Sequence, residues 1–216
     1  MSEPRLRERI VETAQRMNTL GINHGSSGNV SARVEGGFLV TPSAVPYDRL
    51  TPGDIVRVSL DGHPTGHRAP SSEWRFHRDI YAKRPEAGAV VHTHSTAATA
   101  LACLHRPIPP FHYEVAFAGG EDIRCARYET FGTQALSDAA LEALEGRKAC
   151  LLANHGAIAF GPGLDEALAL ADKVEALARQ YLAALAVGEP VLLQGEKLAE
   201  AIAKISGYGL NATPSP

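Results

Sequence analysis

The sequence predicts an α/β domain in which a mostly antiparallel central sheet is covered by helices on both sides. Short runs of apolar, often β-branched residues are bounded by glycine-containing turns, which is typical of strands. Longer segments between them place apolar residues at helical spacing. No linker divides the 216 residues, a length that suits one domain with a sizeable core. We therefore expect a single domain over residues 1–216, with a mobile C-terminal tail from about 207 to 216.

The first half of the chain begins with a helix and continues into a hairpin. Apolar residues recur at helical spacing between Leu6 and Leu20, and Gly21 can end that helix. Gly36-Gly37 is typical of a hairpin turn, and Ser71-Ser72-Glu73 of a serine cap followed by an acid in the first helical turn. In order, the patterns predict a helix over 5–20, a glycine- and hydroxyl-rich stretch over 23–33 that ends in a strand-like piece, strands over 38–40 and 55–58, a polar loop over 61–69 and a helix over 70–83.

The second half of the chain alternates strands with helices. The run Ala89-Val90-Val91 follows a glycine and is typical of a buried strand. Residues 163–186 carry a long apolar stripe, which indicates an amphipathic helix. In order, the patterns predict a strand over 88–94, a helix over 96–104, a loop or short strand at His112-Tyr113, a short strand over 123–125, a helix over 134–144, strands over 149–153 and 156–160, and helices over 163–186 and 196–205.

Composition excludes several classes of function. The net charge of −3 comes without long runs of either sign, so we expect neither nucleic-acid nor membrane binding. No stretch approaches the roughly 20 apolar residues that span a bilayer, and the charged N-terminus lacks the apolar region of a signal peptide. Cys103, Cys125 and Cys150 are far apart, and we expect them to be reduced core residues of a cytoplasmic protein.

Two histidines follow the apolar run with one residue between them. Side chains alternate faces along a strand, so His92 and His94 point the same way while Thr93 points the other way. Their Cα atoms lie roughly 6–7 Å apart, because each strand residue rises about 3.3 Å. A third histidine, His155, ends a similar run. The three are either hydrogen-bonded core residues or ligands of one metal, and the same-face pair favours a catalytic zinc site with three protein ligands.

Glu73 is a candidate for acid–base chemistry beside such a metal. At a helix start it is favoured by unpaired N–H groups, which is the ordinary reason for an acid there. The functional alternative is a metal ligand or general base. His77 follows Glu73 at i+4, and we expect it to support the site or the core rather than to bind metal. Tyr113, beside His112, is either a proton donor or a core or interface aromatic.

Three loops rich in glycine and hydroxyl residues, over 26–29, 41–44 and 71–72, are candidate phosphate sites. Backbone N–H groups, hydroxyls and a helix N-terminus can bind phosphate without a lysine. Each loop by itself is also typical of an ordinary turn or cap. Neither the Walker pattern nor the dinucleotide-binding glycine pattern occurs in the chain.

These motifs together resemble the class II aldolase/adducin family, in the order of that family and over nearly the whole chain. The resemblance rests on Gly28-Asn29-Val30-Ser31, Thr41-Pro42-Ser43, Pro70-Ser71-Ser72-Glu73-Trp74-Arg75-Phe76-His77, Val90-Val91-His92-Thr93-His94, Phe131-Gly132-Thr133 and Leu151-Leu152-Ala153-Asn154-His155-Gly156. The chain departs from the pattern of the fuculose-phosphate enzymes at Ala44, where they have glycine, and at Asn154, before the third histidine. We expect these departures to bear on the sugar and not on the reaction type.

The resemblance implies a site for each part of a sugar-phosphate substrate. It implies one zinc ion, or another divalent metal, per subunit and a homotetramer whose active sites lie at subunit interfaces. Glu73 would be both metal ligand and catalytic acid/base, and Tyr113 would donate a proton in the site of a neighbouring subunit. The implied residues are His92, His94, His155 and Glu73 for the metal; Gly28, Asn29, Ser43, Ala44, Ser71 and Ser72 for the phosphate; and Phe131 and Tyr208 for the sugar pocket.

The expected reaction is retro-aldol cleavage of a ketose 1-phosphate to dihydroxyacetone phosphate and an aldehyde. L-Fuculose 1-phosphate is the first substrate expected, and 5-deoxyribulose or methylthioribulose 1-phosphate in a salvage route is the alternative. Ribulose-phosphate 4-epimerases share the fold and the metal, but they have Asp where this chain has Glu73. A non-catalytic scaffold of the adducin type is a third reading, which the retained histidines and Glu73 disfavour.

Overall fold

A single sheet organises residues 1–207, the part of the chain that this computed structural model describes. Its strand order is β4-β3-β2-β1-β5-β8-β7-β6. Every neighbouring pair is antiparallel except β6 and β7, which are parallel. The strands are β1 Asn29–Val34, β2 Gly37–Val40, β3 Val56–Ser59, β4 Pro64–Thr65, β5 Ala89–Thr93, β6 Cys125–Ala126, β7 Ala149–Leu152 and β8 Gly156–Gly161.

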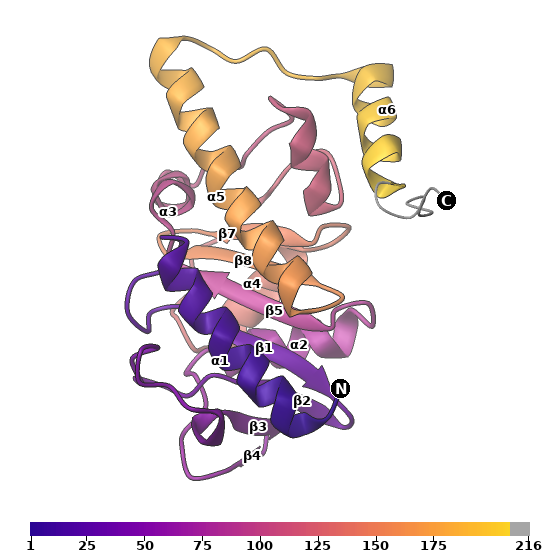
Figure 1. Ribbon diagram of the computed structural model, residues 1–216. Helices are drawn as coiled ribbons and strands as arrows, with labels where there is room; N and C mark the ends of the chain where they lie inside the picture. The colour runs from indigo at the N-terminus through magenta and orange to yellow at the C-terminus, as the bar shows by residue number, and fades with distance from the viewer. Residues whose placement is uncertain (208–216) are drawn as a thin grey trace, which may run out of the picture.

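Helices cover both faces of the sheet, as the sequence predicts. In Figure 1, α1 and α5 cross in front of the strands, whereas α2 and α4 lie behind them. The 3-10 helix η2 lies against α6, which stands apart from the sheet at the end of an extended segment. The helices are α1 Glu3–Thr19, η1 Pro52–Asp54, α2 Trp74–Lys83, α3 Thr96–Cys103, η2 Tyr113–Ala118, α4 Gln134–Ala143, α5 Leu164–Val187 and α6 Gly195–Ser206.

The two faces of the sheet bury separate apolar cores. Along β5, Ala89 and Val91 pack with α1, α3 and α5, whereas Val90 packs with α2 and α4. This alternation follows from the period of two in a strand. His92 has the parity of Val90, so it faces the layer that contains α2.

Three local predictions need correction. The predicted polar loop over 61–69 contains the two-residue strand β4, which pairs with β3 and tolerates Pro64 because it lies at the sheet edge. His112 lies in a bend, as predicted, but Tyr113 is in neither a loop nor a strand. Tyr113 begins η2, because the His112 side chain caps this helix by accepting from the Glu114 N–H. Cys103 is exposed and is therefore not a core residue, although all three cysteines are free.

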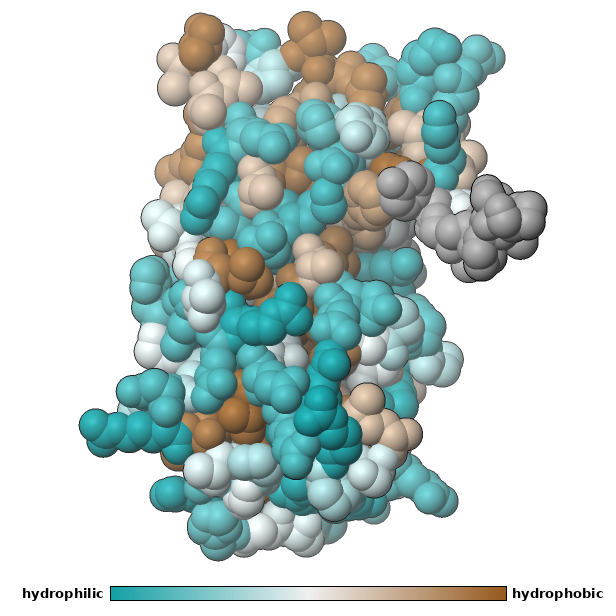
Figure 2. Space-filling view, viewed as in Figure 1, coloured by the Kyte–Doolittle hydropathy of each residue, from teal (hydrophilic) through white to brown (hydrophobic). Residues whose placement is uncertain are grey.

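The C-terminal end of α5 and the segment that follows it leave apolar side chains exposed. Val187 and Val191 are 93% and 90% exposed, and Figure 2 shows apolar residues gathered over this end of the molecule. Helix α6 has no buried residue. None of the helices within residues 1–207 combines the length and the hydropathy that crossing a membrane requires. Tyr208 and the predicted mobile tail lie outside the described residues, apart from Gly207.

Candidate metal and active site

Glu73, His92, His94 and His155 converge on one point. Their candidate ligand atoms all lie within 4.8 Å of one another. His92 Nε2 is 2.9 Å from His94 Nε2 and 3.2 Å from Glu73 Oε2. Glu73 Oε1 is 3.1 Å from His155 Nε2. A tetrahedral centre with bonds of about 2.0–2.1 Å needs ligand atoms roughly 3.3 Å apart, so the cluster fits a zinc-sized cation.

The three imidazoles surround this point almost symmetrically. Ring centroids of His92, His94 and His155 are 4.8, 4.8 and 4.9 Å apart, and the ring planes meet at 75–76°. His92 and His94 therefore do share a face, and His155 joins them from the turn between β7 and β8. Gly156 makes this approach possible, because a Cβ there would lie 2.3 Å from the Thr93 carbonyl oxygen and 3.0 Å from the His94 ring.

Hydrogen bonding prepares the ligands for a metal. His92 Nδ1 lies 2.9 Å from the Ala157 carbonyl oxygen, which can only accept, so this nitrogen carries the proton. The lone pair of His92 Nε2 is then directed at the cluster. Glu73 Oε1 is buried without a hydrogen-bond partner. A cation bound among them would satisfy both of these electron-rich atoms.

Electrostatics keep Glu73 ionised and His94 neutral. Burial raises the pKa of the Glu73 carboxyl, but the imidazoles of His92 and His155 outweigh burial and hold that pKa well below its usual range. Burial, together with the adjacent rings of His92 and His155, lowers the pKa of His94 to about 3. An ionised carboxylate and neutral imidazoles are the forms that bind metals.

The sequence had suggested that Glu73 lies in the first turn of a helix. The structure instead makes Glu73 the N-cap residue of α2. Helix α2 begins at Trp74, and its first turn contains no acid. The serines before it make the preceding turn: the Trp74 N–H donates to the Ser71 carbonyl and the Glu73 N–H to Ser71 Oγ. The Glu73 side chain caps nothing, so it is free to reach the histidines.

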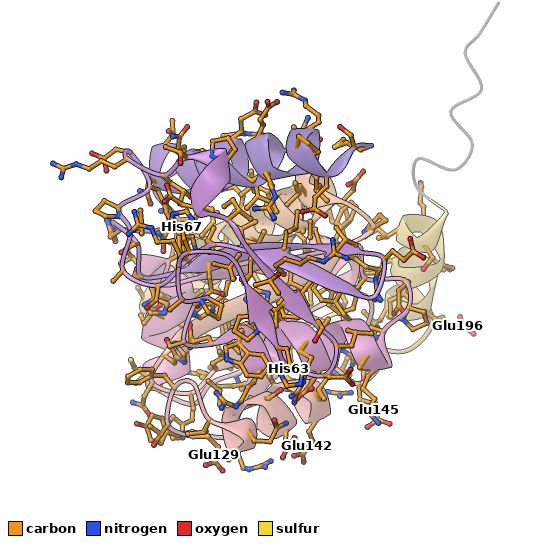
Figure 3. The ribbon with its side chains drawn as sticks, turned by 90° about the horizontal axis from the view of Figure 1, so that it is seen from below. His63, His67, Glu129, Glu142, Glu145 and Glu196 are labelled. Atoms are coloured by element: carbon orange, nitrogen blue, oxygen red, sulfur yellow. The ribbon has the colours of Figure 1, made fainter. Side chains whose placement is uncertain are left out.

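A hollow of about 340 Å³ opens at the cluster. Sequence reasoning predicted five of the residues in its wall, namely Ser72, Glu73, His94, Phe131 and His155, but it missed others. Tyr128 and Glu129 precede the Phe131-Gly132-Thr133 motif and carry no spacing signal that could have found them. Figure 3 shows Glu129 and Glu142 along one edge of the molecule, where Arg127 pairs with both. The lining residues are Ser27, Ser72, Glu73, His94, Tyr128, Glu129, Phe131, Asn154 and His155.

The three predicted phosphate loops lie together at one end of β1 and β2. The Ser43 N–H donates to the Ala69 carbonyl at 3.1 Å, and the Ser71 N–H donates to the Thr41 carbonyl at 3.0 Å. The Val30 N–H donates to Thr41 Oγ1, and this bond connects the end of the loop over 26–29 to the loop over 41–44. Gly28 has no room for a side chain, because a Cβ would lie 2.3 Å from the His92 carbonyl oxygen.

Asn29, one of the six phosphate candidates, has its amide turned toward the candidate metal cluster. Its Nδ2 donates to Glu73 Oε2 at 2.9 Å, and its Oδ1 lies 2.5 Å from His77 Nε2. His77 is fully buried and lies outside the group of candidate metal ligands. It therefore contacts the site through Asn29.

Both departures from the family pattern have left-handed backbone. Asn154 has φ of 54°, which Asn tolerates, and its Oδ1 lies 2.6 Å from His105 Nε2. Ala44, exposed, has φ of 59°, which is strained for a residue with a Cβ.

Ala44→Gly is expected to stabilise the protein. It removes roughly 1–2 kcal/mol of left-handed strain and adds about 0.5–1 kcal/mol of unfolded-state entropy. A net gain of about 0.5–1 kcal/mol should raise the thermal midpoint by roughly 1–4 °C. Ala82→Gly, at an exposed position of α2, is the matched control and should lower the midpoint. An unchanged or lower midpoint for Ala44→Gly would contradict the strain argument.

Tyr113 does not line the hollow at the cluster. It is 53% exposed and lines a separate hollow of about 700 Å³ between η2, α5 and α6. Lys173, on α5, pairs with Glu114 there at 2.8 Å. One copy of the chain therefore brings together the candidate metal ligands but leaves Tyr113 apart from them.

Known proteins similar to this chain include aldolases of sugar phosphates. The Class II Aldolase and Adducin N-terminal domain family matches residues 8–182. A 5-methylthioribulose-1-phosphate/5-deoxyribulose-1-phosphate aldolase of Rhodospirillum rubrum is 52% identical over 212 residues, which are 98% of this chain and 96% of the relative. An L-fuculose phosphate aldolase of Escherichia coli (strain K12) is 46% identical over 211 residues, 97% and 98% of the two chains. A solved L-fuculose 1-phosphate aldolase superposes with a TM-score of 0.90 at 36% identity, covering 93% of this chain and 96% of the other.

Proposed function

Since this chain belongs to the class II aldolase and adducin family, we propose that it is a metal-dependent lyase that cleaves a ketose 1-phosphate into dihydroxyacetone phosphate and an aldehyde. The convergence of Glu73 with His92, His94 and His155 is the observation that carries the proposal. A divalent cation held there, which we propose to be zinc, would polarise the substrate carbonyl as a Lewis acid. A scaffold without catalysis has no use for such a donor set.

Proton transfer is the task that we assign to this chain's own residues. Retro-aldol cleavage removes the proton of the C4 hydroxyl, breaks the C3–C4 bond and returns a proton to C3. Glu73 is proposed as the acid/base group, because Oε1 is buried without a hydrogen-bond partner and so is free to hold or release a proton. The linked loops are proposed to bind the phosphate through Gly28, Asn29, Ser43, Ala44, Ser71 and Ser72.

Self-association would complete the site. We propose a homotetramer in which Tyr113 reaches the site of a neighbouring subunit as a proton donor, with Phe131 and Tyr208 at the sugar pocket. Tyr113 and Phe131 are 53% and 65% exposed, and the exposed apolar end of α5 supports association. Sedimentation equilibrium tests the proposal, and a monomeric active enzyme would contradict it. The free thiols favour a reducing compartment, so we propose a cytoplasmic location.

The substrate is proposed to be a deoxyketose 1-phosphate. The relative named for 5-methylthioribulose 1-phosphate and 5-deoxyribulose 1-phosphate is 52% identical, whereas the L-fuculose phosphate aldolase is 46% identical. This order favours the salvage sugars over L-fuculose 1-phosphate, which the sequence had put first.

A panel of sugar phosphates tests the reaction. Zinc-loaded protein is expected to release dihydroxyacetone phosphate from at least one of the three ketose 1-phosphates, with the highest kcat/KM on a salvage sugar. Dialysis against a chelator should abolish release, and added zinc should restore it. Inactivity on all three by metal-loaded protein would contradict the aldolase. Conversion of ribulose 5-phosphate to xylulose 5-phosphate without release of a triose would support the epimerase in its place.

A further inference from the structure

A line of buried hydrogen bonds leads from the core of the α2 layer to Glu73. Tyr81 and His77, both on α2, each contact Ser31 on β1: the Tyr81 hydroxyl lies 2.7 Å and His77 Nδ1 lies 2.6 Å from Ser31 Oγ. His77 Nε2 lies 2.5 Å from Asn29 Oδ1, and Asn29 Nδ2 lies 2.9 Å from Glu73 Oε2. All five residues are at most 5% exposed. Water therefore does not compete for these bonds.

The direction of every bond in this line is fixed by Glu73. A carboxylate only accepts, so Asn29 must present its NH2 group to Glu73 and its oxygen to His77. His77 Nε2 must then carry the proton. Burial lowers the pKa of His77 to about 3, so its ring is neutral and Nδ1 is an acceptor.

The rest of the line follows from the same reasoning. Ser31 has one hydroxyl proton, and it must donate that proton to His77 Nδ1. The Tyr81 hydroxyl must therefore donate to Ser31 Oγ. Each residue thus donates toward Glu73, and hydrogen bonds that run in one direction polarise and strengthen one another.

We propose that Tyr81, Ser31, His77 and Asn29 form a positioning chain that clamps Glu73 Oε2 and leaves Oε1 for the metal or for the transferred proton. The proposal rests on the proposed role of Glu73 in the metal site. It explains why a histidine with no access to the cluster occupies the centre of the α2 layer. It also gives Asn29 a second task beside phosphate binding.

Two substitutions and their combination test the chain. His77→Phe keeps an aromatic ring but removes both hydrogen bonds, and Ser31→Ala interrupts the line one bond earlier. Ser137→Ala is the matched control, because Ser137 is also 0% exposed and donates a side-chain hydrogen bond, to Asp79 Oδ2 at 2.6 Å, outside the line. Zinc affinity is measured by competition with a chromophoric chelator, coordination by the visible spectrum of cobalt-substituted protein, and function by kcat and KM.

Removal of groups that orient metal ligands typically lowers affinity or activity by about 10–100-fold. His77→Phe is expected to lower zinc affinity and kcat within that range, with KM little changed and the cobalt spectrum altered. Ser31→Ala should have a smaller effect of the same kind. Because the chain acts as a unit, the double variant should be no worse than His77→Phe alone. Ser137→Ala should leave zinc affinity and the cobalt spectrum unchanged.

Two results would overturn the positioning chain. One is that the effects of His77→Phe and Ser31→Ala are additive. The other is that, at equal thermal stability, their losses of zinc affinity and kcat are no larger than those of Ser137→Ala. If His77→Phe does not fold, Tyr81→Phe takes its place in the cycle. Its effect should be no larger than that of Ser31→Ala, and the double variant of these two should be no worse than Ser31→Ala alone. Absence of metal binding by the unmodified protein would instead refute the proposed function. If the enzyme is active and every variant has unaltered zinc affinity and kcat, only the proposed positioning chain is refuted.

Discussion

Replacement of His92 or His155 by alanine is expected to remove the bound metal and to abolish aldol cleavage. Each imidazole contributes one of only three nitrogen donors to the cluster, and His92 is fully buried, so water cannot easily take its place. Removal of a preorganised group that stabilises developing charge lowers kcat by on the order of 10²–10³, and loss of the metal lowers it further. Elemental analysis of purified protein and a triose-release assay measure the two effects.

His63→Ala is the control for these variants. His63 is exposed and lies between β3 and β4, and Figure 3 labels it near the middle of the view from below. This variant should keep full metal content and full activity. A His155→Ala protein that retains stoichiometric zinc and wild-type turnover would show that His155 is not a ligand.

Glu73→Gln is expected to separate metal binding from catalysis. The three histidines remain, so the variant should retain much of the metal, whereas the amide cannot accept or return a proton. General acid–base catalysis contributes about 10²–10⁴-fold, and kcat should fall by that factor. Metal content and kcat measured on the same preparation test both statements. Glu142→Gln, an exposed carboxyl-to-amide change on α4, should alter neither. Wild-type turnover by Glu73→Gln would remove the residue from the mechanism.

Local periodicity accounts for the parts of the site that the sequence predicted. The pairing of His92 with His94 follows from alternation along one strand, and their rings do meet, with centroids 4.8 Å apart. Helices α1, α4 and α5 likewise begin and end near the predicted residues, because apolar spacing reports which face of each helix is buried. The error at Glu73 is also local: a serine pair before a helix suggested a cap, but the serines form the preceding turn.

Contacts between distant segments account for what the sequence did not predict. Strand β4 is too short and polar to carry a period, and it exists because β3 offers it a free edge. Tyr128 and Glu129 enter the wall of the hollow only through the packing of a loop. The hydrogen bonds of Ser31 to His77 and to Tyr81 join residues 46 and 50 positions apart, and nothing near Ser31 in the sequence indicates them.

The sequence by itself determined the order of the longer strands and helices, the shared face of His92 and His94, and the set of residue types suited to a metal and a phosphate. Only the tertiary structure decided that His155 and Glu73 close the cluster, which nitrogen of His92 is protonated, and that Tyr113 is not beside the candidate metal ligands of the same chain. The physical reason is range: side-chain periodicity acts over a few residues, whereas the bond that orients His92 joins positions 65 residues apart.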